Sequence, residues 1–290
     1  MRLSLSITVS EALKQGRQAL ASISETPFLD VQLLLAYALK RKKEWVLAHP
    51  DNHLSTNEFT TFEDNLSRLV SGEALPYLLG SWEFFGRSFH VTEDVLIPRP
   101  ETELLIENAL GFLRSHPKTR LCADIGTGSG CIAISLALEI PDLHVVAVDV
   151  SPSAIEVARV NTRKHGVDDR VTLIVADLLH PFDFRFGLIC ANLPYIPSER
   201  LKRLAVAERE PNLALDGGMD GLTVIRRLAR ELPEWLVPGG RALLEVDSSH
   251  ARVLAGELTS MYSSVRTDVI KDLSGRDRVV ILDRMDPQGS

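Results

Sequence analysis

The sequence has few cysteines and no excess of basic residues. Its three cysteines (Cys122, Cys131 and Cys190) include no C-x-x-C pair, which argues against a disulfide framework and against a zinc site. We expect them to be small core residues. With 32 Lys and Arg against 39 Asp and Glu, the formal net charge is -7. This balance argues against a broad nucleic-acid surface, so a protein or small-molecule partner is expected, with no direct nucleic-acid binding.

Long apolar runs are absent as well. No stretch reaches the roughly 18 apolar residues of a membrane span. The N-terminus, Met1-Arg2-Leu3-Ser4, lacks the apolar segment and cleavage site of a signal peptide. A cytoplasmic location without membrane contact is the expectation that follows. The 290 residues, 45% of them apolar, are enough for one large domain and a smaller one.

The first 75 residues are predicted to be helical. Apolar residues recur at helical spacing over 9–21, 28–39 and 59–70, which predicts a small bundle. The basic run Lys40-Arg41-Lys42-Lys43 follows the second of these helices, where cations are favoured by the helix dipole. Eight Lys and Arg balance nine Asp and Glu in this part. We therefore predict a substrate-docking domain over 1–75 rather than a surface for a polyanion.

Residues 76–97 are rich in aromatics and are predicted to form a β-hairpin connector, with its turn at Gly86-Arg87. A helix is then expected from Glu101, because Pro100 suits a first turn and acidic residues suit its positive end. The apolar residues just before this helix could pass over a cofactor. An ordinary capped helix start explains the same spacing.

From residue 121 onward, short apolar runs alternate with helical patterns, which predicts a doubly wound, Rossmann-like α/β domain over 98–285. Ligands of such sheets bind beyond the carboxyl ends of the strands. The expected strands are about 121–125, 144–149, 171–175, 186–191 and 241–246, with a final pair at about 265–270 and 278–283, and the expected helices are about 101–114, 130–139, 152–165 and 221–236.

Three of these strand ends carry residues suited to a nucleoside. The turn Gly126-Thr127-Gly128-Ser129-Gly130 lets the backbone approach a ligand, although glycines there often serve only packing. Asp149 stands where a carboxylate can accept both ribose hydroxyls, or where it could start the next helix. Asp177 could accept from an adenine amino group while Leu178 covers the ring. Together they favour an adenosine-containing ligand.

The fourth strand end is Asn192-Leu193-Pro194-Tyr195. It offers the Asn192 side-chain oxygen, a Leu193 carbonyl held extended by the following proline, and an aromatic surface, which together suit a planar NH2 group. An amide nitrogen is a poor nucleophile because its lone pair is delocalised, so its partner must be a strong electrophile. The sulfonium methyl of S-adenosylmethionine is one. A plain Asn-x-Pro turn is the alternative explanation.

Several motifs together resemble the HemK/PrmC family of peptide-chain release factor glutamine methyltransferases. The similarity runs from about residue 76 to 282. It implies transfer of a methyl group from S-adenosylmethionine to N5 of the glutamine in the Gly-Gly-Gln motif of bacterial class I release factors. The motifs are Pro76 to Gly80, Phe84, Leu96-Ile97-Pro98-Arg99-Pro100-Glu101-Thr102-Glu103, Asp124 to Gly130, Asn192 to Tyr195, Glu210-Pro211, Asp216 to Leu222 and Ser274 to Arg278.

The resemblance also assigns roles to the site residues. The helical N-terminal part would dock the release factor, residues 126–130 and Asp149 would hold the donor, and residues 192–195 would hold the glutamine. We count Asp177, Leu178 and Asn192 among the cofactor-binding residues as well. The chain departs from the family at Leu193, where a proline is usual, and at Asp247 and His250, where a glycine and a glutamine are common.

Three other functions stay open from the sequence. A DNA adenine N6-methyltransferase uses a similar Asn-Pro-Pro-Tyr motif, but would need a basic duplex-binding surface. A nicotinamide oxidoreductase shares the glycine turn and Asp149 but has no use for residues 192–195. A non-catalytic cofactor-binding adaptor is supported only by Leu193.

Overall fold

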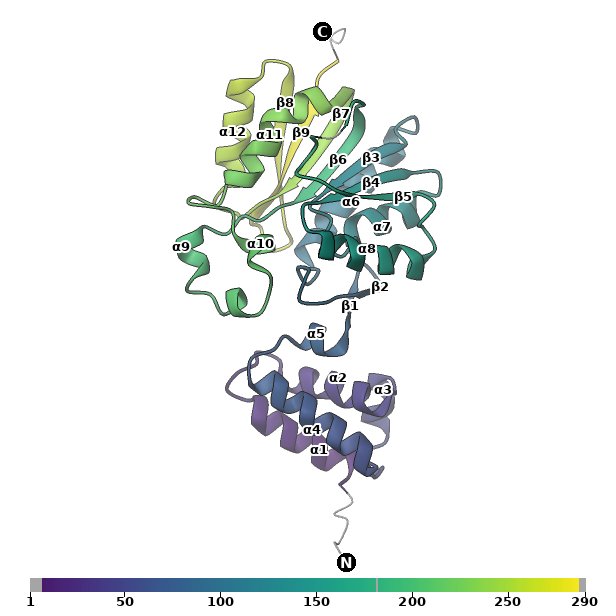
Figure 1. Ribbon diagram of the computed structural model, residues 1–290. Coiled ribbons are helices and arrows are strands. Elements are labelled where there is room, and N and C mark those ends of the chain that lie inside the picture. Colours follow the sequence, from purple (N-terminus) through teal and green to yellow (C-terminus); the bar gives the residue numbers. More distant parts are fainter. Residues whose placement is uncertain (1–6, 181, 287–290) are drawn as a thin grey trace, which may run out of the picture. The chain divides into compact units, whose positions relative to one another are not determined.

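The computed structural model describes residues 7–180 and 182–286. The chain divides into two compact units, Met1–Gly80 and Ser81–Ser290 (Figure 1). No helix within the described residues is long and apolar enough to cross a membrane.

The first unit is a helical bundle with its own apolar core. Phe62, Leu34 and Leu35 are fully buried in it. Its two longer amphipathic helices begin with capping boxes at Thr8 and Ser55, in which each cap and a glutamate three residues later satisfy backbone N–H groups. The predicted bundle is confirmed, and its helices are α1 (Val9–Leu20), α2 (Pro27–Leu39), α3 (Lys43–Ala48), α4 (Thr56–Val70) and α5 (Leu75–Leu79).

The second unit opens with the predicted hairpin, formed by β1 (Ser81–Phe84) and β2 (Arg87–His90). Its turn lies at Phe85 and Gly86, so the predicted position at Gly86-Arg87 was one residue too late. Both turn residues have positive φ, 49° and 69°. A two-residue loop of type I′ has positive φ at both central positions, which leaves Arg87 in the strand.

A seven-stranded sheet forms the centre of this unit, in the order β5-β4-β3-β6-β7-β9-β8. The first five strands along that order are parallel, and β9 and β8 are antiparallel. Because β3 and β6 are neighbours, the strand order reverses there, which places a ligand crevice at their carboxyl ends. The strands are β3 (Leu121–Ile125), β4 (His144–Asp149), β5 (Val171–Val175), β6 (Phe186–Asn192), β7 (Leu236–Glu245), β8 (Val265–Lys271) and β9 (Asp277–Arg284).

Helices cover both faces of the sheet (Figure 1). Strand residues alternate between two apolar cores, one under α6 and α7 and one under α11 and α12. Cys122, Cys131 and Cys190 are free and buried in the first of these cores, as expected. The helices are α6 (Glu101–Ser115), α7 (Cys131–Glu139), α8 (Pro152–His165), α11 (Thr223–Trp235) and α12 (Ala251–Met261), with short α9 (Ser198–Leu201), the 3-10 turn Ala205–Glu208 and α10 (Asn212–Leu215) in the loop after β6.

The doubly wound prediction is confirmed, although it missed the short elements after β6 and differs at two further places. Strand β7 begins at Leu236, ahead of the predicted 241, because Leu236 pairs with Phe186 before a bulge passes the Pro238-Gly239-Gly240 segment. Helix α12 was not predicted. It packs on β8 and β9 and covers that end of the sheet.

Candidate functional site

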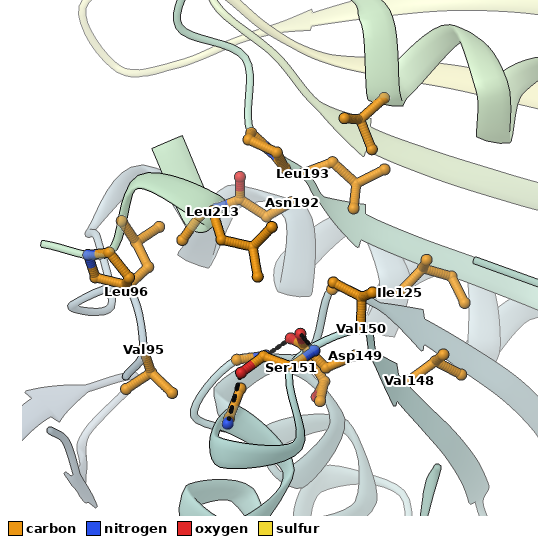
Figure 2. Close-up of a pocket in the computed structure, with 18 of the residues that line it drawn as sticks. Val95, Leu96, Ile125, Val148, Asp149, Val150, Ser151, Asn192, Leu193 and Leu213 are labelled. Atoms are coloured by element: carbon orange, nitrogen blue, oxygen red, sulfur yellow. Dashed lines mark hydrogen bonds between the residues drawn. The ribbon is translucent and has the colours of Figure 1, made fainter. Parts of the chain in front are cut away.

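A cavity of about 790 Å³ lies at the carboxyl ends of the parallel strands. It is lined by residues that follow β3, β4, β5 and β6, by the segment before α6 and by residues from α10 to α11, all within the second unit. Figure 2 shows Asp149 and Ser151 on one side, with Asn192, Leu193 and Leu213 across the cavity from them. Topology and cavity therefore agree on one site.

The glycine turn after β3 borders this cavity. Gly126 has φ 74°, and a Cβ there would approach Leu193 Cδ2 to 2.8 Å, so a side chain at 126 would collide with the neighbouring strand end. A Cβ at Gly128 would meet nothing within 4 Å, and this residue lines the cavity. Thr127 and Ser129 are buried. The turn therefore packs against Leu193 at Gly126 and leaves free space beside Gly128 on the cavity side.

Asp149 links the second strand end to the glycine turn. Its Oδ2 accepts from the Gly128 backbone N–H at 2.9 Å, and its Oδ1 accepts from the Ser151 N–H at 2.9 Å. Burial raises the pKa of this carboxyl. Asp149 does not cap helix α8, because Ser151 does so by accepting from the Ala154 N–H at 3.2 Å. Each carboxylate oxygen accepts one backbone bond and retains a second lone pair for a ligand hydroxyl.

The third strand end differs from the second in exposure. Asp177 and Leu178 both line the cavity, but the Asp177 side chain is half exposed and pairs with Arg227 of α11 at 2.5 Å. Leu178 is buried and takes the left-handed conformation, φ 57°. A non-glycine residue there costs about 1 kcal/mol, which the surrounding structure offsets. That conformation keeps an apolar side chain at the cavity wall.

Asn192 is the last residue of β6 and lines the cavity. Its Nδ2 donates to Thr102 Oγ1 at 3.0 Å. An amide carries its donor and acceptor at opposite ends, so this bond directs Oδ1 away from Thr102. Leu193 is buried against Gly126. Pairing of Asn192 with Glu245 of β7 holds the backbone that a proline at 193 would otherwise restrain.

Tyr195 is placed differently from the other three residues of its motif. It is not among the described residues that line the cavity, whereas Asn192, Leu193 and Pro194 are. Its hydroxyl donates to Glu245 Oε1 at 3.5 Å, and burial raises its pKa. Gly221 packs behind it, since a Cβ at 221 would lie 2.5 Å from the Tyr195 carbonyl oxygen and 2.7 Å from His250.

The segment ahead of α6 is tied to the far side of the site by one buried acid. Glu210 Oε2 accepts from the Ile97 N–H at 3.1 Å, and its Oε1 is bonded to the Arg99 guanidinium. Val95, Leu96 and Pro98 line the cavity. This placement favours the cofactor-covering interpretation of the segment over an ordinary helix start.

Three buried polar residues were not predicted as site residues: Thr102, Asp124 and Glu245. Burial raises the pKa of Asp124 to about 7, and its Oδ2 accepts from the Thr127 hydroxyl at 2.7 Å and from the Ala133 N–H at 3.1 Å. The signal was present in the sequence, since Asp124 and Glu245 each interrupt or end an apolar strand.

Asp247 and His250, the two departures from the family motif after β7, are both hydrogen bonded in the loop between β7 and α12. Asp247 accepts from Arg200 at 3.2 Å and from the Ser249 hydroxyl at 2.7 Å. His250 donates its backbone N–H to the Asp247 carbonyl at 2.9 Å and begins helix α12. These bonds hold the loop beside the site without a glycine at 247.

Comparison with known proteins gives a consistent result. Residues 11–80 match the family described as "PrmC N-terminal domain", and residues 101–209 match "Methyltransferase small domain". The "Release factor glutamine methyltransferase" of Geobacter sulfurreducens is 39% identical over 277 residues, covering 94% of this chain and 95% of that protein. The protein of the same name from Cereibacter sphaeroides is 40% identical over 266 residues, covering 91% and 93%.

Solved structures share the fold at low identity. A methyltransferase from Pyrococcus furiosus has a TM-score of 0.51 at 18% identity, covering 77% of this chain and 99% of that one. The hMettl16 catalytic domain has a TM-score of 0.53 at 17% identity, covering 77% and 82%. They support the architecture of the sheet and its helices.

Proposed function

We propose, from the premise that this chain belongs to the release factor glutamine methyltransferase family, that it methylates a glutamine side chain of peptide chain release factors. The chain is a methyltransferase that uses S-adenosylmethionine. The acceptor we propose is N5 of the glutamine in the Gly-Gly-Gln motif of bacterial class I release factors. We also propose the cytoplasm as its place of action.

The observation that carries this proposal is the orientation of Asn192. Its Nδ2 is engaged by Thr102, so its Oδ1 can accept from a substrate N–H. The Leu193 carbonyl, extended because Pro194 follows, supplies a second acceptor. Two acceptors beside each other select a group with two N–H bonds, and a primary amide is such a group.

These two acceptors also address the weak nucleophilicity of an amide. Gripping both N–H bonds fixes the nitrogen and directs its lone pair out of the amide plane. S-adenosylmethionine supplies an electrophilic methyl group when bound. Asn192 Oδ1 and the Leu193 carbonyl would stabilise the positive charge that develops on the nitrogen as it accepts the methyl group, and the nitrogen would then lose a proton to solvent. Alignment alone can lower such a barrier by roughly 7 to 11 kcal/mol at most.

The residues that would hold the cofactor fit an adenosine-containing cation. Asp149 offers acceptor capacity for ribose hydroxyls, and the free space beside Gly128, where a Cβ would meet nothing within 4 Å, leaves room for a ligand. Leu178 supplies apolar surface for a ring, with Asp177 beside it. The carboxylates near the cavity suit a positively charged group. No cysteine or serine nucleophile is required by this chemistry.

The test is methyl transfer measured with labelled donor and an intact release factor. The same factor with its motif glutamine replaced by alanine, and duplex DNA, serve as matched controls. We expect label on the intact factor alone, with the added methyl located on the glutamine side chain by mass spectrometry. Label on DNA would favour the adenine N6-methyltransferase alternative, and donor binding without transfer would favour the adaptor.

The role of Asn192 has its own test in the single-turnover rate with donor saturating. Removing one acceptor that acts in the transition state costs roughly 2.7–4 kcal/mol, about 10² to 10³ in rate, by analogy with the loss of an oxyanion-hole donor. Asn192→Ala should lose this much with little change in donor affinity. Asn192→Asp keeps an oxygen and should retain more activity. Equal rates in the two variants would contradict the acceptor role.

A further inference from the structure

A second layer of polar residues lies behind Asn192 on the same face of the sheet. Asn192 and Glu245 are register partners on the parallel strands β6 and β7, so their side chains project side by side. Helix α6 packs over both strands. Thr102 is in its first turn, at the start of the buried stripe that continues with Leu105 and Ile106. The hydroxyl of Thr102 therefore lies where the polar ends of two strands meet.

Asn192 and Thr102 are hydrogen bonded to each other, whereas Glu245 has few partners. Thr102 Oγ1 accepts from Asn192 Nδ2 at 3.0 Å. Burial raises the pKa of Glu245, and the nearby Thr102 hydroxyl acts in the opposite direction. Glu245 is 1% exposed, Tyr195 reaches its Oε1 only at 3.5 Å, and Oε2 has no partner among the described residues. A carboxyl buried with so few bonds is a costly feature that stability does not explain.

We propose that Thr102 and Glu245 are positioning residues that set which end of the Asn192 amide faces the substrate. This inference rests on the proposed function, in which Asn192 accepts from a glutamine N–H. An ionised Glu245 accepts the Thr102 proton, so the Thr102 oxygen must accept from Asn192 Nδ2, which leaves Oδ1 for the substrate. A protonated Glu245 can donate to Thr102 instead. The Thr102 proton then turns toward Asn192, whose amide presents Nδ2 to the substrate NH2 group, and two donors oppose each other.

The environment of Glu245 places its protonation in an experimentally accessible pH range. Burial raises its pKa to about 7. Arg278 of β9 lowers that pKa, Glu101 of α6 raises it, and the hydroxyls of Thr102 and Tyr195 lower it. Cys131, at the start of α7, also lies within range of its charge. Because the ionised form is the productive one, turnover should rise with pH through about 7 and level off above it.

Three variants test this control of the Asn192 amide by Thr102 and Glu245, at saturating donor and release factor. Thr102→Val keeps the shape but removes the hydroxyl, and should lower the single-turnover rate about tenfold or more. Thr102→Ser restores the hydroxyl and should return most of the rate. Glu245→Gln presents an NH2 donor to Thr102, as the protonated acid does, and should be slow at every pH without the rise through neutrality. Burial also raises the pKa of Asp124 to about 7, and Asp124 is present in all three variants. A pH dependence caused by Asp124 would therefore persist in Glu245→Gln.

A second measurement needs no turnover. The carboxylic acid stretch of Glu245 in the infrared spectrum, identified by its loss in Glu245→Gln, reports its protonation in the free protein. Thr102→Val should move this titration to higher pH, because the hydrogen bond that favours the charged form is lost. An unmoved titration, or a Thr102→Val enzyme with the wild-type rate and pH profile, overturns the inference. Failure of wild-type enzyme to methylate any release factor would instead refute the proposed function, and the infrared result would still decide whether Thr102 controls Glu245.

Discussion

Replacing Asp149 by alanine should disconnect the glycine turn from the strand end that faces it. The substitution removes an acceptor that holds the Gly128 and Ser151 N–H groups, both at 2.9 Å. Hydrogen bonds to a charged acceptor contribute about 1.5–3 kcal/mol each. If the same carboxylate also accepts the ribose hydroxyls, the bound state loses those bonds as well. Losing a net 3 kcal/mol weakens binding about 10²-fold.

Two further variants identify the origin of this loss. Asp149→Asn keeps one oxygen but turns an NH2 donor toward one of the two backbone N–H groups, so its donor affinity should fall between those of wild type and alanine. Ser151→Ala removes the helix cap that accepts from Ala154 at 3.2 Å. It should cost about 1 kcal/mol of stability while leaving donor affinity nearly unchanged.

Calorimetric titration of S-adenosylmethionine into each folded protein measures the effect, with thermal unfolding as the check on folding. The expected order of affinity is wild type and Ser151→Ala first, then Asp149→Asn, then Asp149→Ala. An unchanged dissociation constant in a folded Asp149→Ala protein would refute the ribose assignment. Equal losses in Ser151→Ala and Asp149→Ala would mean that helix α8, rather than the carboxylate, determines binding.

Three further predictions follow from the structure. A chain beginning at Ser81 should still bind donor, because the cavity is lined by residues of the second unit. It should lose most methylation of an intact release factor when that factor is below saturation. Equal turnover by the shortened and full-length chains would contradict the docking role of the first unit. Burial raises the pKa of Asp124 to about 7. The unfolded chain therefore binds fewer protons than the folded one between about pH 4 and 7, and stability from this group falls as pH rises through that window, by on the order of 1 to 4 kcal/mol. Urea unfolding of Asp124→Asn should show a smaller decline, and an identical decline would rule this group out. Glu210→Ala should free the segment that its two oxygens hold at Ile97 and Arg99, which would raise KM for donor more than it lowers kcat; a change in kcat alone would place Glu210 in the chemical step.

Local patterns predicted the fold of this chain well where they repeat. Strands β3, β4 and β5 have the predicted bounds, because each is a short apolar run with a clear polar or glycine end. Errors arose where tertiary pairing overrides local chemistry. Pro238-Gly239-Gly240 has turn composition, yet it lies inside β7 because Leu236 pairs with Phe186 across a bulge. The hairpin turn moved by one residue for a similar reason, since strand register and not the sequence alone selects the two positive-φ positions.

The candidate site could be predicted from the sequence only where a functional residue directly follows a recognisable strand. Strand ends followed by glycine or a polar residue are visible in the sequence, so the sequence predicts the glycine turn, Asp149 and Asn192, and all three line the cavity. Partners brought together by packing were not. Asp177 could be placed at the cavity, but its pairing with Arg227 depends on where α11 docks. Tyr195 belongs to the same tetrapeptide as Asn192, yet its side chain points to Glu245 and away from the cavity lining.

Leu193 shows how one departure from a motif can be absorbed by the surrounding fold. A proline at 193 would restrict the backbone of Asn192 to extended conformations. In this chain Asn192 is already extended because it is hydrogen bonded into β6 and paired with Glu245. Its amide is fixed separately, by Thr102. The side chain at 193 is then free to serve packing, and it fills the space above Gly126 that a Cβ there would otherwise enter. Gly126 and Leu193 therefore depend on each other, and Gly126→Ala should be tolerated less well here than it would be with a smaller residue at 193.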